Sequence, residues 1–235
     1  MGGGHRAGHG LPARLREIAR LLDRRFGRPE ACGHEIAPER NLVLTILSQN
    51  TTDANRDRAY ETLTRRFPSL PKLAAADPGE VEEAIRVGGL AKAKARAILG
   101  ALSRLKRERG GYSLDFLRSL PLAEARAYLT SFPGIGVKTA NILLLFSFGL
   151  PAFPVDTHIL RVTKRLGLVP ANATLSKAAL SLEPHVPKDG HGPLHLNLIR
   201  LGREVCRPRT PLCPACPLLP VCPEGERRAA GKASA

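Results

Sequence analysis

The chain is 235 residues long, with 43% hydrophobic and 24% charged residues, which excludes wholesale disorder and allows one large domain or two small ones. Aromatic residues make up only 4% and Trp is absent, so aliphatic side chains must form the core, which favours helices over a β-sandwich or barrel. The formal charge of +15 indicates a polyanionic partner, with nucleic acid the first candidate and an anionic membrane the second.

The longest apolar stretch and the N-terminal segment narrow the class of protein further. The most apolar stretch, Ile142 to Phe148, is too short to span a bilayer, which argues against a membrane protein. Residues 1–28 contain seven Arg and apolar side chains at helical spacing, as in an organelle-targeting peptide. They also contain Glu17 and Asp23 and no Ser, so an ordinary first helix is expected after a disordered tail at Met1 to Gly10, in a cytoplasmic protein.

Pro and Gly residues divide the rest of the chain into predicted helices. In chain order the helices are expected at 11–28, 42–48, 53–67, 78–87, 92–106, 122–129, 138–148, 158–166 and 194–205. Asp53 and Asp77 are expected N-caps, because their side chains can accept a hydrogen bond from the first turn. The helix at 138–148 is almost wholly apolar after its first turn, which predicts a buried central helix. A domain crossover is expected at Pro151 to Pro154, and the tail from Gly225 is expected to be frayed.

Four of the five cysteines lie close together near the C-terminus, at Cys206, Cys213, Cys216 and Cys222. A disulfide framework spreads its cysteines over a small secreted domain, whereas four thiolates in one short segment suit a metal site. Structural zinc sites usually pair two short knuckles, and only Cys213 and Cys216 form one here. One short spacing with two longer arms favours a 4Fe–4S cluster, with zinc as the alternative. Cys32 stands apart and is expected to be a buried core thiol.

A glycine-rich turn, Phe132-Pro133-Gly134-Ile135-Gly136, separates two of the predicted helices. Two glycines let the backbone turn tightly and approach a partner, and the N–H groups at the start of the next helix suit a phosphate. A plain helix–helix turn is the alternative. In a chain of charge +15, we interpret the motif as a helix–hairpin–helix that grips a DNA backbone without reading its sequence, through Gly134 and Gly136.

Lys138, in the first turn of the next predicted helix, is the candidate nucleophile. An ordinary lysine, with a pKa of about 10.4, is protonated at neutral pH, so this role requires burial or a helix N-terminus to favour the neutral amine. A contact with phosphate is the alternative. Asp156, in the sequence Val155-Asp156-Thr157-His158, is an expected N-cap and can also stabilise positive charge on a substrate.

These motifs together resemble the endonuclease III family of DNA base excision repair glycosylases. The segment Pro133 to Asn141, the segment Val155 to His158 and the four cysteines follow one another in the order and spacing of that family. The resemblance implies an all-α, two-domain helix–hairpin–helix glycosylase fold, with a six-helix barrel at 31–150. The second domain would join residues 1–30 to 151–235 and carry a 4Fe–4S cluster.

The resemblance also implies the partner and the chemistry. Double-stranded DNA with a damaged base or an abasic site would bind between the domains of a monomer. Lys138 matches the family's Schiff-base lysine and Asp156 its essential aspartate. The implied reaction is removal of oxidised pyrimidines, followed by β-elimination that nicks the strand. Adenine-mismatch glycosylases of the family lack a lysine at this position, so Lys138 argues against that branch, and a metal-stapled DNA-binding module without chemistry is the other alternative.

Several flanking residues match positions that contact DNA in the family. Gln49 and Asn50 fall where a polar side chain enters the space left by the flipped nucleotide; many members carry Gln where this chain has Asn50, which leaves open which of the two fills the gap. Leu90 falls where an apolar wedge enters beside the opposite strand, with a place in the core as the alternative. Arg207 and Arg209 lie between the first two clustered cysteines, where they can present cations to phosphate or form a solvated basic surface.

Overall fold

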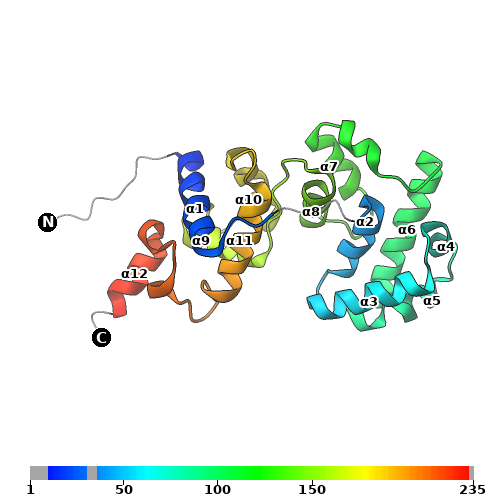
Figure 1. The fold of residues 1–235 in the computed structure, drawn as a ribbon, viewed down its shortest axis with the longest axis horizontal. Helices are drawn as coiled ribbons and strands as arrows, with labels where there is room; N and C mark the ends of the chain where they lie inside the picture. Colours follow the sequence, from blue (N-terminus) through cyan, green and yellow to red (C-terminus); the bar gives the residue numbers. More distant parts are fainter. Residues whose placement is uncertain (1–9, 31–35, 233–235) are drawn as a thin grey trace. The chain divides into compact units, whose positions relative to one another are not determined.

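The computed structural model describes residues 10–30 and 36–232 (Figure 1). Within these ranges the chain forms α-helices and short 3₁₀ turns without any β-strand, which confirms the expected all-α fold. Cys32 and residues 1–9 of the expected tail lie outside the described residues. No helix in the described part of the chain has both the length and the apolar character needed to cross a membrane.

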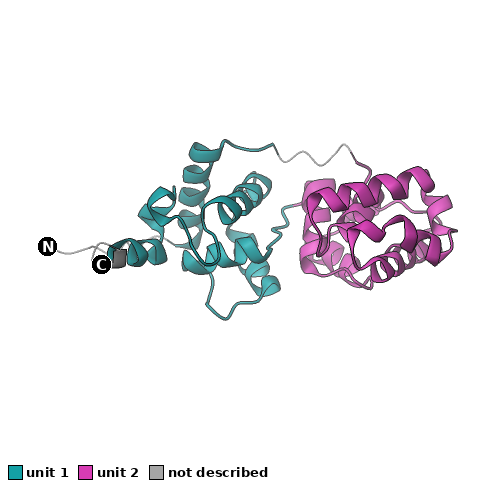
Figure 2. Ribbon diagram, turned by 90° about the horizontal axis from the view of Figure 1, so that it is seen from below, with its two compact units in different colours: residues 1–32, 151–235 teal, residues 33–150 magenta. Residues whose placement is uncertain are grey.

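Two compact units make up the structure (Figure 2). Unit 1 comprises residues 1–32 and 151–235, and unit 2 comprises residues 33–150. Unit 2 is therefore one continuous segment, inserted between the N-terminal helix and the C-terminal part of unit 1.

Unit 2 is a bundle of helices. Its elements are α2 (Pro38–Leu47), α3 (Asp53–Arg66), α4 (Leu70–Ala74), α5 (Pro78–Ala84), the 3₁₀ turn η1 (Arg86–Gly88), α6 (Ala91–Arg109), the 3₁₀ turn η2 (Asp115–Ser119), α7 (Leu122–Thr130) and α8 (Val137–Phe148). α8 is buried along most of its length, as predicted, and packs against α2 and α7, while α4 and α5 pack against α6. Leu143 and Leu144 of α8 are fully buried, and burial of each such side chain stabilises the fold by about 1.5–3 kcal/mol.

Unit 1 packs its longest helices side by side. Its elements are α1 (Leu11–Phe26), α9 (Thr157–Arg165), α10 (Leu175–Leu182), the 3₁₀ turn η3 (Glu183–His185), α11 (His191–Glu204), the 3₁₀ turns η4 (Cys213–Ala215) and η5 (Leu219–Val221), and α12 (Pro223–Lys232). α11 packs against both α1 and α9. A Cβ at Gly202 of α11 would lie 2.9 Å from the Cβ of His158, so the close approach of α11 to α9 requires glycine.

The helix ends confirm some sequence predictions and correct others. Asp77 caps α5 as expected, its side chain accepting a hydrogen bond from the N–H of Gly79. The cap of α3 is Thr52 rather than Asp53, because the Thr52 hydroxyl accepts from the N–H of Asn55, and Asp53 is the first helical residue. The expectation of a frayed tail from Gly225 is wrong: α12 runs through this region and packs against α9 and the 3₁₀ turns of the cysteine segment.

Candidate functional site

The turn between α7 and α8 has the backbone of a hairpin built for close approach. Gly134 has a left-handed φ of +80°, and a Cβ there would lie 3.4 Å from the Cβ of Ala97. Gly136 is the N-cap of α8, and because it has no side chain, no cap side chain accepts from the N–H groups of the first turn. Both glycines are exposed, while Phe132 and Ile135 are buried and anchor the turn. The uncapped start of α8 therefore presents backbone N–H groups with the positive end of the helix dipole behind them, which suits a phosphate.

Lys138 is the second residue of α8 and is half-buried. The hairpin turn ends two residues before it, so the amine belongs to the same rigid element as the candidate phosphate site. Thr139, next in the helix, is buried. An amine at the start of a helix, beside an exposed turn, can reach a ligand that the turn holds.

Gln49 and Asn50 follow α2 but behave differently. The Gln49 amide donates to the carbonyl of Gly134 at 3.1 Å and contacts the Thr139 hydroxyl at 3.4 Å, so it braces the hairpin turn. Asn50 is exposed and has a left-handed φ of +49°. Only the structure distinguishes the two, since both are short polar amides at adjacent positions.

Leu90 lies on the surface rather than in the core. Its side chain is 58% exposed, and its φ of +50° is left-handed although it is not glycine. Leu90 caps the start of α6 without any side-chain hydrogen bond. An exposed leucine held in this costly backbone conformation is available for an apolar contact with a partner.

Sequence reasoning missed Lys94 of α6. Its side chain is 2% exposed, and its Nζ donates to the carbonyl oxygens of Leu47 at 2.7 Å and Gly88 at 2.8 Å. Burial lowers the pKa of this lysine. The available signal was its spacing, because Lys94 lies four residues before Ile98 and eight before Leu102, on the stripe of α6 that faces the core.

Asp156, in unit 1, is the N-cap of α9. Its Oδ1 accepts a hydrogen bond from the N–H of Ile159 at 2.8 Å, which confirms the predicted capping role. The carboxylate lies at the positive end of the α9 dipole, a favourable place for a negative charge. Lys138 belongs to unit 2, so the two candidate catalytic residues are described in separate units.

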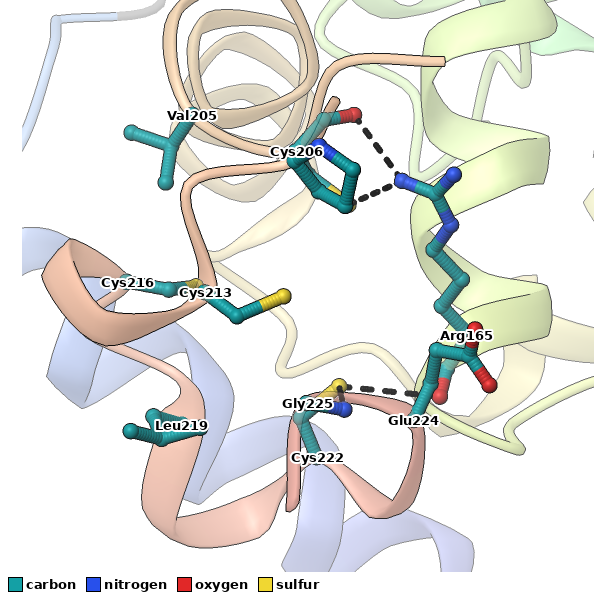
Figure 3. Close-up of a pocket in the computed structure, with 10 residues that line it drawn as sticks. Arg165, Val205, Cys206, Cys213, Cys216, Leu219, Cys222, Glu224 and Gly225 are labelled. Carbon is teal, nitrogen blue, oxygen red and sulfur yellow. Dashed lines mark hydrogen bonds between the residues drawn. The ribbon is translucent and has the colours of Figure 1, made fainter. Parts of the chain in front are cut away.

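The four clustered cysteines are free thiols that line one pocket of unit 1 (Figure 3). The pocket is enclosed by η4, η5, the start of α12 and Arg165 of α9. Within the described residues, no three His, Cys, Asp or Glu side chains come close enough together to hold a single metal ion.

Cys206 and Cys222 each accept a hydrogen bond at sulfur. Arg165 Nη1 lies 3.2 Å from Cys206 Sγ, and the N–H of Gly225 lies 3.3 Å from Cys222 Sγ. Burial raises the pKa of the Cys216 thiol to about 11, and the neighbouring cysteines raise it further than burial alone. Burial raises the pKa of the Cys222 thiol as well, so these two thiols need a cationic centre to become thiolates, and four sulfurs around one pocket fit an iron–sulfur group.

Arg165 also holds the loop that follows Cys206. Its guanidinium donates to the carbonyl oxygens of Arg207 at 2.8 Å and Pro208 at 2.7 Å. Arg207 and Arg209 are exposed on this loop, and Arg207 Nε donates to the carbonyl of Glu204 at 3.1 Å. Both arginines therefore lie on a loop whose backbone is hydrogen-bonded to Arg165 of α9.

A family model described as HhH-GPD superfamily base excision DNA repair protein matches residues 43–188. Fold and site thus define the chain as a helix–hairpin–helix protein of base excision repair. Endonuclease III of Thermotoga maritima is 34% identical over 218 residues, 93% of this chain and 96% of that one. The chain belongs to the endonuclease III family of DNA glycosylases, as its motifs predict.

Other relatives agree with this family. The solved structure of a trapped endonuclease III–DNA covalent intermediate matches with a TM-score of 0.78 at 30% identity, covering 93% of this chain and 98% of that one. A protein of Arabidopsis thaliana described as a DNA glycosylase is 40% identical over 148 residues, 63% of this chain. The chain spans 50% of the length of that plant relative.

Proposed function

We propose that the protein is a bifunctional DNA glycosylase and abasic-site lyase, which removes oxidised pyrimidines from double-stranded DNA. The observation that carries the proposal is the place of Lys138, half-buried in the first turn of α8 and directly after the exposed hairpin turn. A turn that holds a phosphate beside an amine presents that amine to the adjoining sugar. The similar endonuclease III forms a covalent intermediate with DNA, which supports a covalent step of this kind.

Extrusion of the damaged nucleotide comes first. Flipping costs less for a damaged base because its pairing or stacking is already weakened. We assign the vacated space to Asn50, because its side chain is exposed whereas the Gln49 amide is engaged with the hairpin turn. Leu90, 58% exposed, is the wedge beside the opposite strand.

The chemistry then belongs to two side chains. The neutral amine of Lys138 attacks C1′ of the sugar while the bond from C1′ to the base breaks, and the base leaves with that electron pair and a proton. The carboxylate of Asp156 offsets the positive charge that develops on the sugar. Ring opening yields a Schiff base between Lys138 and C1′. It acidifies the C2′ hydrogen, whose loss breaks the bond from C3′ to oxygen and nicks the strand, and water then releases Lys138.

Cys206, Cys213, Cys216 and Cys222 would hold a 4Fe–4S cluster. The support is the shared pocket and the N–H donors to the sulfurs of Cys206 and Cys222. When bound, the cluster would supply structure, by fixing the loop that carries Arg207 and Arg209 toward phosphate.

The test replaces Lys138 with Gln. The amide keeps polarity and much of the length but has no amine to attack C1′, so strand nicking and borohydride trapping should be lost. Binding to abasic duplex should stay within about 3-fold, because the hairpin N–H groups and the arginines supply most of the affinity. The measurements are a borohydride trapping gel and a binding titration with the same abasic duplex.

Lys72→Gln is the matched control, since Lys72 is an exposed lysine of α4 and the charge change is the same. This variant should trap DNA like the wild-type protein. Trapping of Lys138→Gln at wild-type yield would show that another amine is the nucleophile. A wild-type protein that binds abasic DNA but neither nicks nor traps it would favour the binding-module alternative.

A further inference from the structure

Lys94 is a buried cation whose charge is met by backbone oxygens. Its side chain is 2% exposed, and its two hydrogen bonds, of 2.7 and 2.8 Å, both go to carbonyl groups. Within the described residues it forms no ion pair with a carboxylate. Burying an ammonium group is costly, and burial lowers the pKa of Lys94; the two hydrogen bonds to carbonyl oxygens offset part of this cost.

The two carbonyl groups stand at the roots of two separate loops. Leu47 is the last residue of α2, and the loop after it, residues 48–52, carries Asn50; this is the Asn50 loop. Gly88 ends η1, and the segment 88–90 carries Leu90; this is the Leu90 loop. One ammonium group therefore joins two loops that are about forty residues apart in the sequence.

Both loops hold a strained residue. Asn50 and Leu90, with φ of +49° and +50°, are the non-glycine residues of positive φ in the described ranges. Such conformations persist only where the surrounding structure holds them in place. Lys94 bonds to the chain three residues before Asn50 and two residues before Leu90, so it is placed to fix both.

Packing leaves the Leu90 loop little room to move away. A Cβ at Gly88 would lie 3.2 Å from the Cβ of Ala59 in α3, so the Gly88 backbone is pressed against that helix. Lys94 approaches the same glycine from α6, with its Nζ 4.0 Å from that Cβ position. The Gly88 carbonyl is thus held between α3 and Lys94, and α3 itself begins where the Asn50 loop ends.

We propose that Lys94 is a positioning residue that holds the Asn50 loop and the Leu90 loop in one fixed arrangement, so that both side chains enter duplex DNA together. The inference rests on the proposed function and names a residue that acts through the two loops without touching DNA. Lys94 is not a second nucleophile, because its amine is buried and both carbonyl groups occupy it.

The experiment compares one abasic oligonucleotide as a single strand and in a duplex. Lys94→Met keeps the length of the side chain but removes the donor. A single strand has no opposite strand to separate, so its trapping by borohydride should stay within about 2-fold of wild type, while duplex trapping should fall about 10–100-fold, as expected for a misplaced contact. A lysine with a merely structural role would lower both substrates equally, through the folded fraction.

Ile98→Ala supplies that structural comparison, because Ile98 is fully buried one turn further along α6 and its truncation removes packing without removing a hydrogen bond. Its ratio of duplex to single-strand trapping should equal the wild-type ratio. In a background of Asn50→Ala with Leu90→Ala, adding Lys94→Met should change the ratio less than about 2-fold, because the side chains through which it acts are gone.

The outcomes separate the two claims. If the wild-type protein traps DNA but Lys94→Met has the wild-type ratio of duplex to single-strand trapping, the inference is overturned and the proposed function stands. The same holds if Lys94→Met lowers that ratio as strongly in the Asn50→Ala, Leu90→Ala background as it does in the wild-type background. Wild-type failure to trap either substrate overturns the proposed lyase and the inference with it. If Lys94→Met does not fold, Lys94→Arg retains the cation with a longer, planar group; a smaller duplex-selective loss is expected, and the wild-type ratio would overturn the proposal.

Discussion

At the residue scale, Asp156 has a local role and a proposed chemical role in one carboxylate. Its Oδ1 caps α9 by accepting from the N–H of Ile159 at 2.8 Å. The chemical role needs negative charge, whereas the cap needs only an oxygen acceptor. The two roles are therefore separable by substitution, because Asn is as good an N-cap as Asp.

Asp156→Asn should retain the helix cap and lose the charge. We expect single-turnover base release to slow about 10²–10³-fold, as when one electrostatic contact to a transition state is removed. The free energy of unfolding should change by less than about 1 kcal/mol. Asp156→Ala is the companion variant and should lose about 1 kcal/mol through the missing cap as well. Base release by Asp156→Asn at the wild-type rate would reduce Asp156 to a cap.

At the element scale, the segment 206–222 lacks a core of its own. Two short 3₁₀ turns, η4 and η5, are its regular structure, and Leu218 is the one side chain in it that is buried. Arg165 ties its first part to α9 through hydrogen bonds to Arg207 and Pro208. Because this segment buries so little apolar surface, we expect its conformation to depend on a bound group.

Iron analysis tests that dependence. If the four cysteines hold a 4Fe–4S cluster, purified protein should be yellow-brown and contain about four irons per chain with little zinc. Cys213→Ala should lose most of the iron and make the segment 206–222 sensitive to limited proteolysis, because the three remaining thiolates cannot supply all four ligands of the cluster. Leu212→Ala, at an exposed neighbouring position, should retain the iron. A colourless, folded protein with one zinc would select the alternative metal.

At the scale of the whole molecule, charge governs the proposed interaction with DNA. The formal charge of +15 is carried mostly by Arg and Lys on the surface, and several of these are already neutralised by ion pairs such as Arg65 with Glu61 at 2.6 Å. Arg207 and Arg209, by contrast, are exposed and carry backbone contacts at most in the described structure. Exposed arginines such as Arg207 and Arg209, which are not engaged in ion pairs within the described residues, should contribute most to phosphate binding.

Salt dependence measures how many such contacts form. Affinity of Lys138→Gln for abasic duplex should fall about 10³-fold or more between 50 and 200 mM salt, if about six phosphates are neutralised. Adding Arg207→Gln and Arg209→Gln should reduce the slope of log affinity against log salt by about 2, one for each lost contact. Arg65→Gln is the matched charge control and should leave the slope unchanged. An unaltered slope in the Arg207 and Arg209 variant would remove this loop from the DNA interface.

The amino-acid sequence by itself determined the class of protein and the order of its helices. The positions of Pro and Gly predict helix boundaries because these residues restrict or free the local backbone within one or two turns. The caps at Asp77 and Asp156 were predictable for the same reason, and both are confirmed. Motif order led to the endonuclease III family, which the family model over residues 43–188 supports independently. α10 and α12 were not predicted although both carry local signals: Thr174 caps α10 by accepting from the N–H of Lys177, and α12 begins at Pro223 with Glu224 and Glu226 in its first turn.

Tertiary structure alone decided how the candidate residues are held. The exposure of Leu90, the engagement of Gln49 with Gly134, and the burial of Lys94 between two loops all depend on contacts far apart in the sequence. Gln49 and Gly134, for example, are 85 positions apart, and no local spacing encodes their hydrogen bond. The residue type determines which chemical groups a side chain carries. Its contact partners are determined by tertiary packing, which forms only when the whole unit has folded.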